Sequence, residues 1–110
     1  MAQFMLLLHE HRADFAKVSA EDIQAIIQKY TDWRTQVAAV GHKLKDEGGR
    51  HLQMLNEQLR VVDGPYAEAK EVMGGYFIVS AANYDEAVKV AQSCPHLKYG
   101  GRIELREIEE

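Results

Sequence analysis

The sequence is short of cysteine, of basic residues and of long apolar runs, and each shortage excludes a class of protein. Cys94 is the only cysteine in 110 residues, so neither an intrachain disulfide nor a multi-cysteine metal site can form. The net charge of −4 comes without a basic stripe, which argues against nucleic-acid binding. The apolar run Phe4–Leu8 is too short to span a membrane and lacks the flanks of a signal peptide. We therefore expect a cytoplasmic protein with no nucleic-acid or membrane partner.

The length and composition fit one globular domain over residues 1–110. Apolar residues make up 46% of the chain and charged residues 27%, values typical of a folded protein. A chain of this size buries only about 60–68% of its unfolded surface, so its own core is modest. Association with further copies would therefore add significantly to the buried area.

The apolar periodicity predicts an alternation of strands and helices. One helix is expected after the N-cap Ser19, ending at Gly41, and a second after the N-cap Asn83, ending at Pro95. The expected strands are Gln3–His9, Lys43–Asp46, Leu59–Val62, Tyr76–Val79 and Arg102–Arg106. A short helical turn is expected at Lys70–Met73. The order β-α-β, further strand, β-α-β predicts an α+β protein with a ferredoxin-like split βαβ fold and an antiparallel sheet.

Two of the expected strands are apolar on both faces. Gln3–His9 and Tyr76–Val79 contain unbroken apolar runs, whereas two helices can cover only one face of a sheet. The other face needs a partner, and a second copy packed sheet to sheet is the simplest one. The sequence therefore predicts a homodimer.

The segment Asp63-Gly64-Pro65-Tyr66 has two interpretations. Asp63, Gly64 and Pro65 are typical of a rigid turn between strands. Alternatively, Asp63 is a carboxylate held at a strand end, and such a group in a partly dry cleft serves as a general base or an electrostatic anchor. The residues alone leave both interpretations open.

Six short motifs along the chain resemble the YCII-related family, and more narrowly its branch named for the Asp-Gly-Pro-Phe motif. They are Asp63-Gly64-Pro65-Tyr66-Ala67-Glu68, Lys70-Glu71, Gly74-Gly75-Tyr76, Asp85-Glu86-Ala87, Cys94-Pro95 and Gly101-Arg102-Ile103-Glu104-Leu105-Arg106. The resemblance implies a dimeric α+β barrel. Some members are thought to use a His–Asp pair in a cleft, one removes chloride from a muconolactone-type compound, and members of this branch are often encoded beside extracytoplasmic-function sigma factors.

The sequence departs from the family pattern at two positions. Tyr66 replaces the phenylalanine of the motif, and Tyr30 occupies the position at which classical members carry a helix histidine. Tyrosine has an unperturbed pKa near 10, so it is a poor base at neutral pH. Tyr30 also lies on the apolar stripe of its helix, where core packing is its ordinary role. The His–Asp mechanism therefore does not transfer directly to this chain.

The candidate catalytic residues are Asp63, Tyr30, His96 and His9. Asp63 is the candidate base or anchor, and the other three are candidate proton donors. No third metal ligand is fixed beside the histidines, so we expect neither a metal nor another cofactor. Three functions remain open: an enzyme acting on a small organic acid or lactone-like compound, a non-catalytic small-molecule binder, and a regulatory protein associated with a sigma factor.

Overall fold

The computed structural model describes residues 1–11, 19–45, 48–64 and 71–109. The strands are β1 (Ala2–His11), β2 (Val40–Lys43), β3 (Arg50–Leu55), β4 (Gln58–Asp63), β5 (Glu71–Ala81) and β6 (Arg102–Glu107). The helices are α1 (Ala20–Gln36), α2 (Tyr84–Gln92) and the short α3 (Pro95–Lys98). Among these helices, none has the length and apolar content that crossing a membrane requires.

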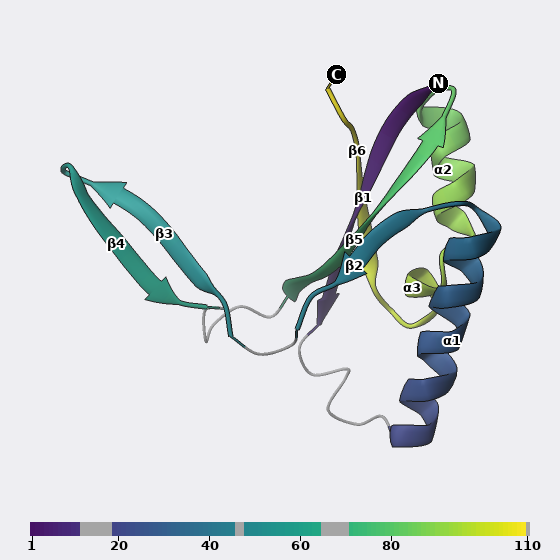
Figure 1. The fold of residues 1–110 in the computed structure, drawn as a ribbon, viewed down its shortest axis with the longest axis horizontal. Coiled ribbons are helices and arrows are strands. Elements are labelled where there is room, and N and C mark those ends of the chain that lie inside the picture. Colours follow the sequence, from purple (N-terminus) through teal and green to yellow (C-terminus); the bar gives the residue numbers. More distant parts are fainter. Residues whose placement is uncertain (12–18, 46–47, 65–70, 110) are drawn as a thin grey trace.

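The main sheet confirms the predicted fold class. Its strand order is β2-β5-β1-β6, and all three pairings are antiparallel. With the β3–β4 hairpin set aside, this is the strand order of a split βαβ ferredoxin-like fold. The helices lie together on one side of the sheet, and the hairpin projects from the other end of the molecule (Figure 1).

Both predicted helix N-caps are confirmed. The Ser19 hydroxyl accepts a hydrogen bond from the backbone N–H of Asp22 at 3.2 Å. The Asn83 side-chain oxygen accepts one from the backbone N–H of Glu86 at 3.0 Å. Each bond satisfies a donor that the first helical turn leaves without an intrahelical partner.

The predicted end of the first helix is wrong. The helix ends at Gln36, and Gly41 lies inside β2, where Val40 pairs with Ile78. Ala38 turns the chain with a φ of 56°, so the chain reverses before the glycine. Gly41 instead permits the close approach of β2 to β5, since a Cβ there would collide with the carbonyl oxygen of Tyr76. Sheet pairing thus overrides the helical propensity of this segment.

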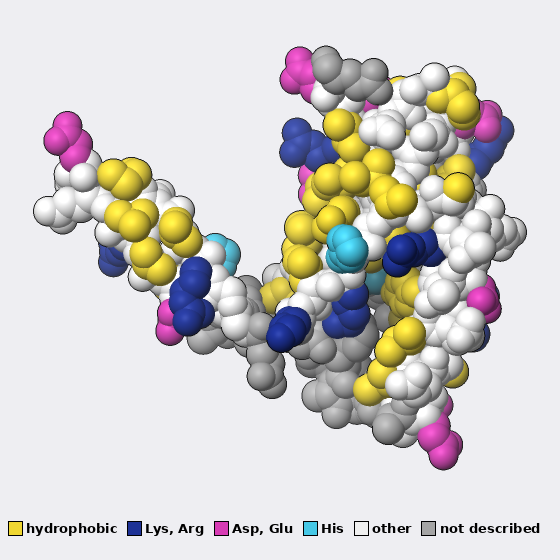
Figure 2. Space-filling view, in the orientation of Figure 1, with side chains coloured by type: hydrophobic (Ala, Val, Ile, Leu, Met, Phe, Trp, Pro, Cys, Tyr) yellow, Lys and Arg dark blue, Asp and Glu magenta, His cyan; other side chains and the backbone are white. Residues whose placement is uncertain are grey.

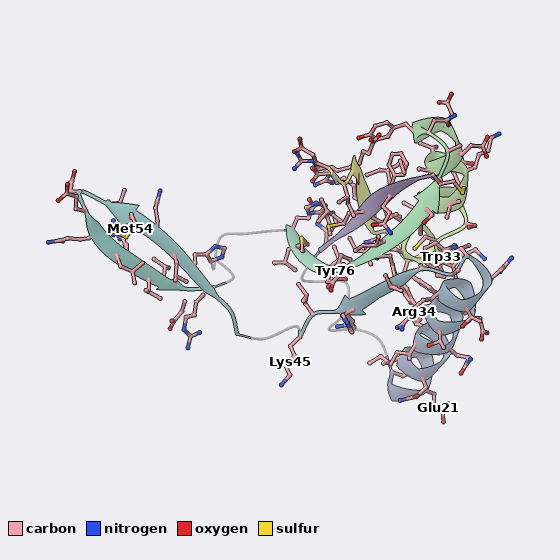
Figure 3. The ribbon with its side chains drawn as sticks, turned by 45° about the horizontal axis from the view of Figure 1, so that its top comes forward. Glu21, Trp33, Arg34, Lys45, Met54 and Tyr76 are labelled. Carbon is pink, nitrogen blue, oxygen red and sulfur yellow. The ribbon has the colours of Figure 1, made fainter. Side chains whose placement is uncertain are left out.

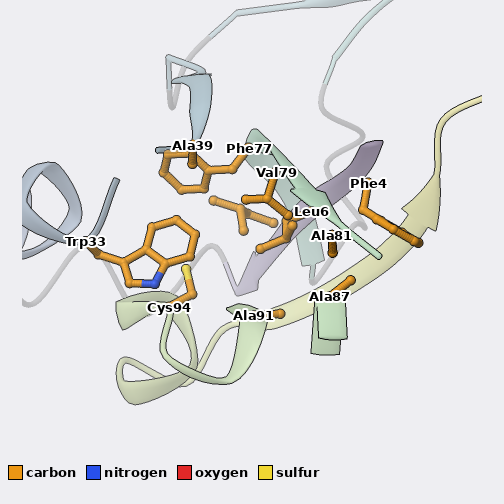
Figure 4. Packing of buried hydrophobic residues seen from close by; sticks show 11 residues of the cluster. Phe4, Leu6, Trp33, Ala39, Phe77, Val79, Ala81, Ala87, Ala91 and Cys94 are labelled. Carbon is orange, nitrogen blue, oxygen red and sulfur yellow. The ribbon is translucent and has the colours of Figure 1, made fainter. Parts of the chain in front are cut away.

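The core lies between the main sheet and the helices. Alternate residues of β1 and β5 point toward the helices and are buried there. The buried apolar residues are Phe4, Leu6, Leu8, Trp33, Ala39, Phe77, Val79, Ala81, Ala87, Ala91 and Cys94 (Figure 4). The Trp33 indole meets Phe77 edge to face at 5.0 Å between ring centroids, and its Nε1 donates to Ser93 Oγ at 2.8 Å. This contact fixes α1 to the end of α2.

The β3–β4 hairpin forms a separate two-stranded sheet. Its tight turn at Asn56 and Glu57 has positive φ at both residues, the geometry that matches the right-handed twist of a hairpin. The labelled Met54 of the hairpin lies far from Tyr76 of the main sheet (Figure 3). The strand expected at Leu59–Val62 is confirmed as part of β4, but it belongs to this second sheet and not to the main sheet.

The expected helical turn at Lys70–Met73 is wrong for its described part. Glu71, Val72 and Met73 belong to β5 and pair with the end of β1. Lys70 lies outside the described residues, as do Pro65 and Tyr66 of the Asp-Gly-Pro-Tyr segment. This pairing extends β1 and β5 beyond their apolar residues. The local sequence pattern did not predict this extension.

No other described element of the chain covers the face of the main sheet opposite the helices. Because side chains alternate along a strand, the residues between the core positions point to this side. We call this surface the open face. Its described residues include Met5, Leu7, His9, His11, Val40, His42, Glu71, Met73, Tyr76, Ile78, Arg102, Glu104 and Arg106. The apolar residues lie mainly on β1 and β5, and the charged residues lie along β6 and around the end of β1.

Candidate functional site

A cluster of charged side chains on the open face centres on His9. Its Nε2 lies 3.2 Å from Oε1 of Glu104, and its Nδ1 lies 3.8 Å from Oε1 of Glu71. The Glu71 carboxylate is held by Arg102, whose Nη2 is 2.6 Å away. The imidazole thus sits between two carboxylates, with its side chain 20% exposed. Pairing with Arg102 lowers the pKa of Glu71, so this carboxylate stays ionised.

The strand register brings this cluster together. His9 lies opposite Arg102, and Glu104 lies opposite the neighbouring open-face residue Leu7. Glu71 reaches the cluster because β5 continues past an irregularity between Leu8 and His9, where the register shifts. Bulges of this kind redirect side chains at strand ends and often lie beside functional sites. The shift leaves His9 on the open face.

Tyr30 and His96 form a second pair on the helix side of the same strand. The Tyr30 hydroxyl lies 3.0 Å from Nδ1 of His96, and Nε2 of His96 lies 2.8 Å from the backbone carbonyl oxygen of His9. A carbonyl oxygen only accepts, so Nε2 carries the hydrogen. In the neutral imidazole Nδ1 is then the acceptor, and the Tyr30 hydroxyl donates to it. His9 therefore links both pairs, through its side chain on one face and its carbonyl on the other.

Burial keeps both members of this second pair uncharged. His96 is only 3% exposed, and removal from water lowers its pKa. Burial likewise raises the pKa of Tyr30 well above its usual value. The Tyr30 ring also stacks against Phe77, with 6.4 Å between centroids, so the expected packing role is present. The pair joins α1, α3 and β1 by hydrogen bonds between neutral groups.

Acidification should weaken this link. An unfolded histidine titrates near 6.5, whereas the folded chain holds the pKa of His96 lower. The stabilisation is therefore complete above pH 6.5 and is lost as the pH falls toward the folded-state pKa. We expect the free energy of unfolding to fall below pH 6.5, by up to ~1.4 kcal/mol per pH unit from this group.

Urea unfolding at pH 8, 6 and 5 would measure this loss, with His96→Gln as the matched variant. Glutamine keeps a donor for the His9 carbonyl but does not titrate in this range. The pKa of Glu71 is lowered from its usual value of 4.5 by Arg102, so the stability from this ion pair is lost only below pH 4.5, outside this window. An equally steep decline in the variant would show that another group is responsible.

The sequence did not indicate the carboxylates of the site. Glu104 and Glu71 lie far along the chain from His9, and only the strand pairing brings them close. Glu10 is also buried, at 8% exposed, on the helix side. Two glycines make room for buried side chains on the helix side, because a Cβ at Gly74 would collide with the Glu10 carboxylate and one at Gly101 with the His96 ring. These glycines were a local signal for Glu10 and His96, but not for Glu71 or Glu104.

Asp63 lies apart from the other three candidate residues. It ends β4 on the hairpin, its side chain is 87% exposed, and its Oδ1 lies 3.2 Å from Nε of Arg50 across the two strands. His9, Tyr30 and His96 meet at the main sheet instead. Within one chain, therefore, the carboxylate of Asp63 is a solvated member of a cross-strand ion pair.

The His9 cluster has the components of proton transfer. A carboxylate beside an imidazole orients the ring and stabilises its protonated form, which is the arrangement used in general acid–base catalysis. Among the described residues, no group of three histidine, cysteine, aspartate or glutamate side chains is placed to hold a metal ion. The cluster around His9 is suited to acid–base chemistry and to electrostatic binding.

The comparison with known families agrees with the fold and with the motifs. The model of the YCII-related domain matches residues 2–110, which covers nearly the whole chain. No curated protein is similar enough in sequence to match it. The match spans both βαβ halves, the hairpin and every candidate residue of the site. This protein is therefore a member of the YCII-related domain family.

Proposed function

We propose that the protein is an acid–base enzyme that acts on a small organic acid or lactone-like compound at the open face of the main sheet. The observation that carries this proposal is the 3.2 Å separation between His9 Nε2 and Glu104 Oε1 beside an apolar surface. Glu104 accepts the hydrogen of Nε2, which leaves Nδ1 of His9 as the proton acceptor. The carboxylate of Glu104 then stabilises the imidazolium that forms.

The neighbouring residues suit an organic anion. Met5, Leu7 and Ile78 are half-buried on the open face and offer an apolar surface to a carbon skeleton. Arg106 lies opposite Met5 and supplies a guanidinium for a carboxylate. Arg102 is less suited to this role because Glu71 already occupies its guanidinium through two hydrogen bonds. The substrate would thus lie between Arg106 and His9.

A homodimer would complete the site. Among the described residues of one chain, no second layer packs on the open face, so its apolar part stays in contact with water. Covering this face with a second copy would exclude water from the His9 cluster, and charges interact more strongly where water is excluded. We therefore place the working site at the seam between two copies.

Proton exchange tests this proposal directly. We expect the protein to exchange an acidic C–H proton of a bound lactone or keto acid with deuterium from D₂O, which NMR detects as signal loss. Arg106→Gln should weaken binding about tenfold by removing a charge-assisted hydrogen bond. Lys89→Gln, on the exposed side of α2, is the matched control and should change nothing.

The alternative function is non-catalytic binding by the same groups. A non-catalytic binder would unfold at a higher temperature in the presence of the organic acid, and Arg106→Gln would abolish this stabilisation. No C–H proton of the acid would exchange with deuterium. Stabilisation without exchange across a panel of lactone, hydroxy and keto acids would replace the enzyme proposal with the binder. Absence of both effects would remove the open face as a small-molecule site.

A further inference from the structure

The β3–β4 hairpin has one apolar face that no other described part of the chain covers. Alternation along the two strands places four large apolar side chains on the same side, paired as Leu52 with Val61 and Met54 with Leu59. Their exposed fractions lie between 51 and 64%. The opposite side carries polar pairs such as Gln53 with Arg60. We call the side with Leu52, Met54, Leu59 and Val61 the arm face.

A hairpin whose apolar face is exposed is not stable by itself in water. A two-stranded sheet alone in water is marginally stable at best, and it gains stability when its apolar face packs on another layer. No other described element of the chain provides that layer, since the hairpin projects away from the main sheet (Figure 1). The arm face is therefore open to packing on a surface of another molecule.

The size of the exposed surface points to a partner of substantial area. The chain exposes 8235 Å², whereas a compact monomer of this mass exposes about 6,200 Å². The radius of gyration is 15.9 Å, against ~13 Å for a compact chain of this length. The excess of about 2,000 Å² exceeds the ~800 Å² that each partner buries in a standard stable interface. A small ligand could not cover such an area.

The chain itself contains a surface that matches the arm face. Hydrophobic side chains gather on the hairpin and again over the strands of the main sheet on the same side of the molecule (Figure 2). The open face contributes Met5, Leu7, Tyr76 and Ile78, which no described element covers. Two copies related by a twofold axis can satisfy both surfaces at once, because each arm then packs on the sheet of the other copy.

We propose that the protein forms an arm-exchanged dimer in which the arm face of each copy packs on the open face of its partner. This interface goes beyond the pairing of two sheets, because it makes the hairpin the element that covers the partner's site. Asp63 lies on the same side of the hairpin as Val61 and pairs across it with Arg50. The arm therefore carries the Asp63–Arg50 pair to the partner's open face, where the site described above is located.

Matched charge substitutions on the two sides of β3 test the interface. Leu52→Glu places a carboxylate on the arm face, and Gln53→Glu places the same group on the opposite face. We expect sedimentation equilibrium to show a dimer for the natural chain and for Gln53→Glu. In Leu52→Glu the dissociation constant should rise at least ~100-fold, because a buried carboxylate without a partner is costly.

Both variants should keep the circular dichroism spectrum of the natural chain, since neither residue belongs to the core of the main sheet. A monomeric natural chain at 50 micromolar, or equal dissociation of the two variants, would overturn the proposal. Sedimentation measures the mass of the assembly, so it tests the dimer interface independently of whether the site catalyses a reaction. A dimer insensitive to both substitutions would show that another surface joins the copies.

Cysteine crosslinking distinguishes exchange between chains from folding back within one chain. Met54→Cys in one preparation and Ile78→Cys in a second, differently tagged preparation are mixed and treated with a short bismaleimide. We expect a crosslinked product that carries both tags, while the natural Cys94 stays protected by burial. If Met54→Cys and Ile78→Cys react only when both are placed in one chain, the arm covers its own sheet and the exchange is disproved.

Discussion

Replacing His9 with glutamine should lower kcat/KM by a factor of about 10²–10⁴, the usual loss when a general acid–base group is removed. Glutamine retains a donor for the Glu104 carboxylate at 3.2 Å, so the geometry of the cluster survives. It cannot take up a proton at neutral pH, so the chemical step is lost. The measurement uses the acid that exchanges deuterium most rapidly, followed by NMR at saturating and limiting concentrations.

Two further variants show whether the loss belongs to His9 itself. Glu104→Gln should lower kcat about 10–100-fold with little change in KM, because it removes only the stabilisation of the imidazolium. His51→Gln, on the polar side of the hairpin, exchanges the same residue types outside the cluster and should leave kcat/KM unchanged. Equal losses in the His9 and His51 variants would remove His9 from the mechanism.

Replacing Phe4 with alanine should cost about 3–5 kcal/mol of folding free energy, near the upper end for a single core truncation. Phe4 is fully buried near the start of β1, and its ring meets Tyr84 edge to face at 4.9 Å between centroids. The Tyr84 hydroxyl in turn accepts a hydrogen bond from the backbone N–H of Glu107. The cavity would therefore loosen α2 and β6 together. Urea unfolding monitored by circular dichroism measures the change.

Val88→Ala is the matched control for this loss. Val88 lies on α2 and is 44% exposed, so shortening it leaves no cavity. We expect a cost below about 1 kcal/mol. Because a domain of this size has a total stability of only ~5–15 kcal/mol, Phe4→Ala should unfold at a much lower urea concentration than Val88→Ala. Similar midpoints for both variants would show that the core is not organised around β1.

The sequence and the structure agree best where a local interaction decides the conformation. Ser19 and Asn83 were predicted as N-caps because their side chains bond to the backbone three residues ahead, and both bonds are present. The disagreements come from pairing between distant segments. Val40 and Gly41 left the helix because they pair with β5, and Glu71–Met73 became strand because they pair with β1.

The candidate site likewise contains residues that the sequence predicted and residues that only the strand pairing revealed. His9, Tyr30 and His96 were selected from residue type and position, and the structure places all three around one end of β1. Their catalytic roles remain predictions. Glu104 was not selected, because nothing within its own strand distinguishes it from any solvated glutamate. Its proximity to His9 depends on antiparallel pairing across 95 residues, which only the folded register reveals.

The sequence by itself determined the fold class and the family motifs, because hydrophobic periodicity and capping are local properties of the chain. The tertiary structure alone decided that His9 meets Glu104 and Glu71 while Asp63 stands on a separate hairpin. These outcomes depend on strand register and on the direction of the hairpin. Both are set by contacts between segments far apart in the sequence, so no local pattern can encode them.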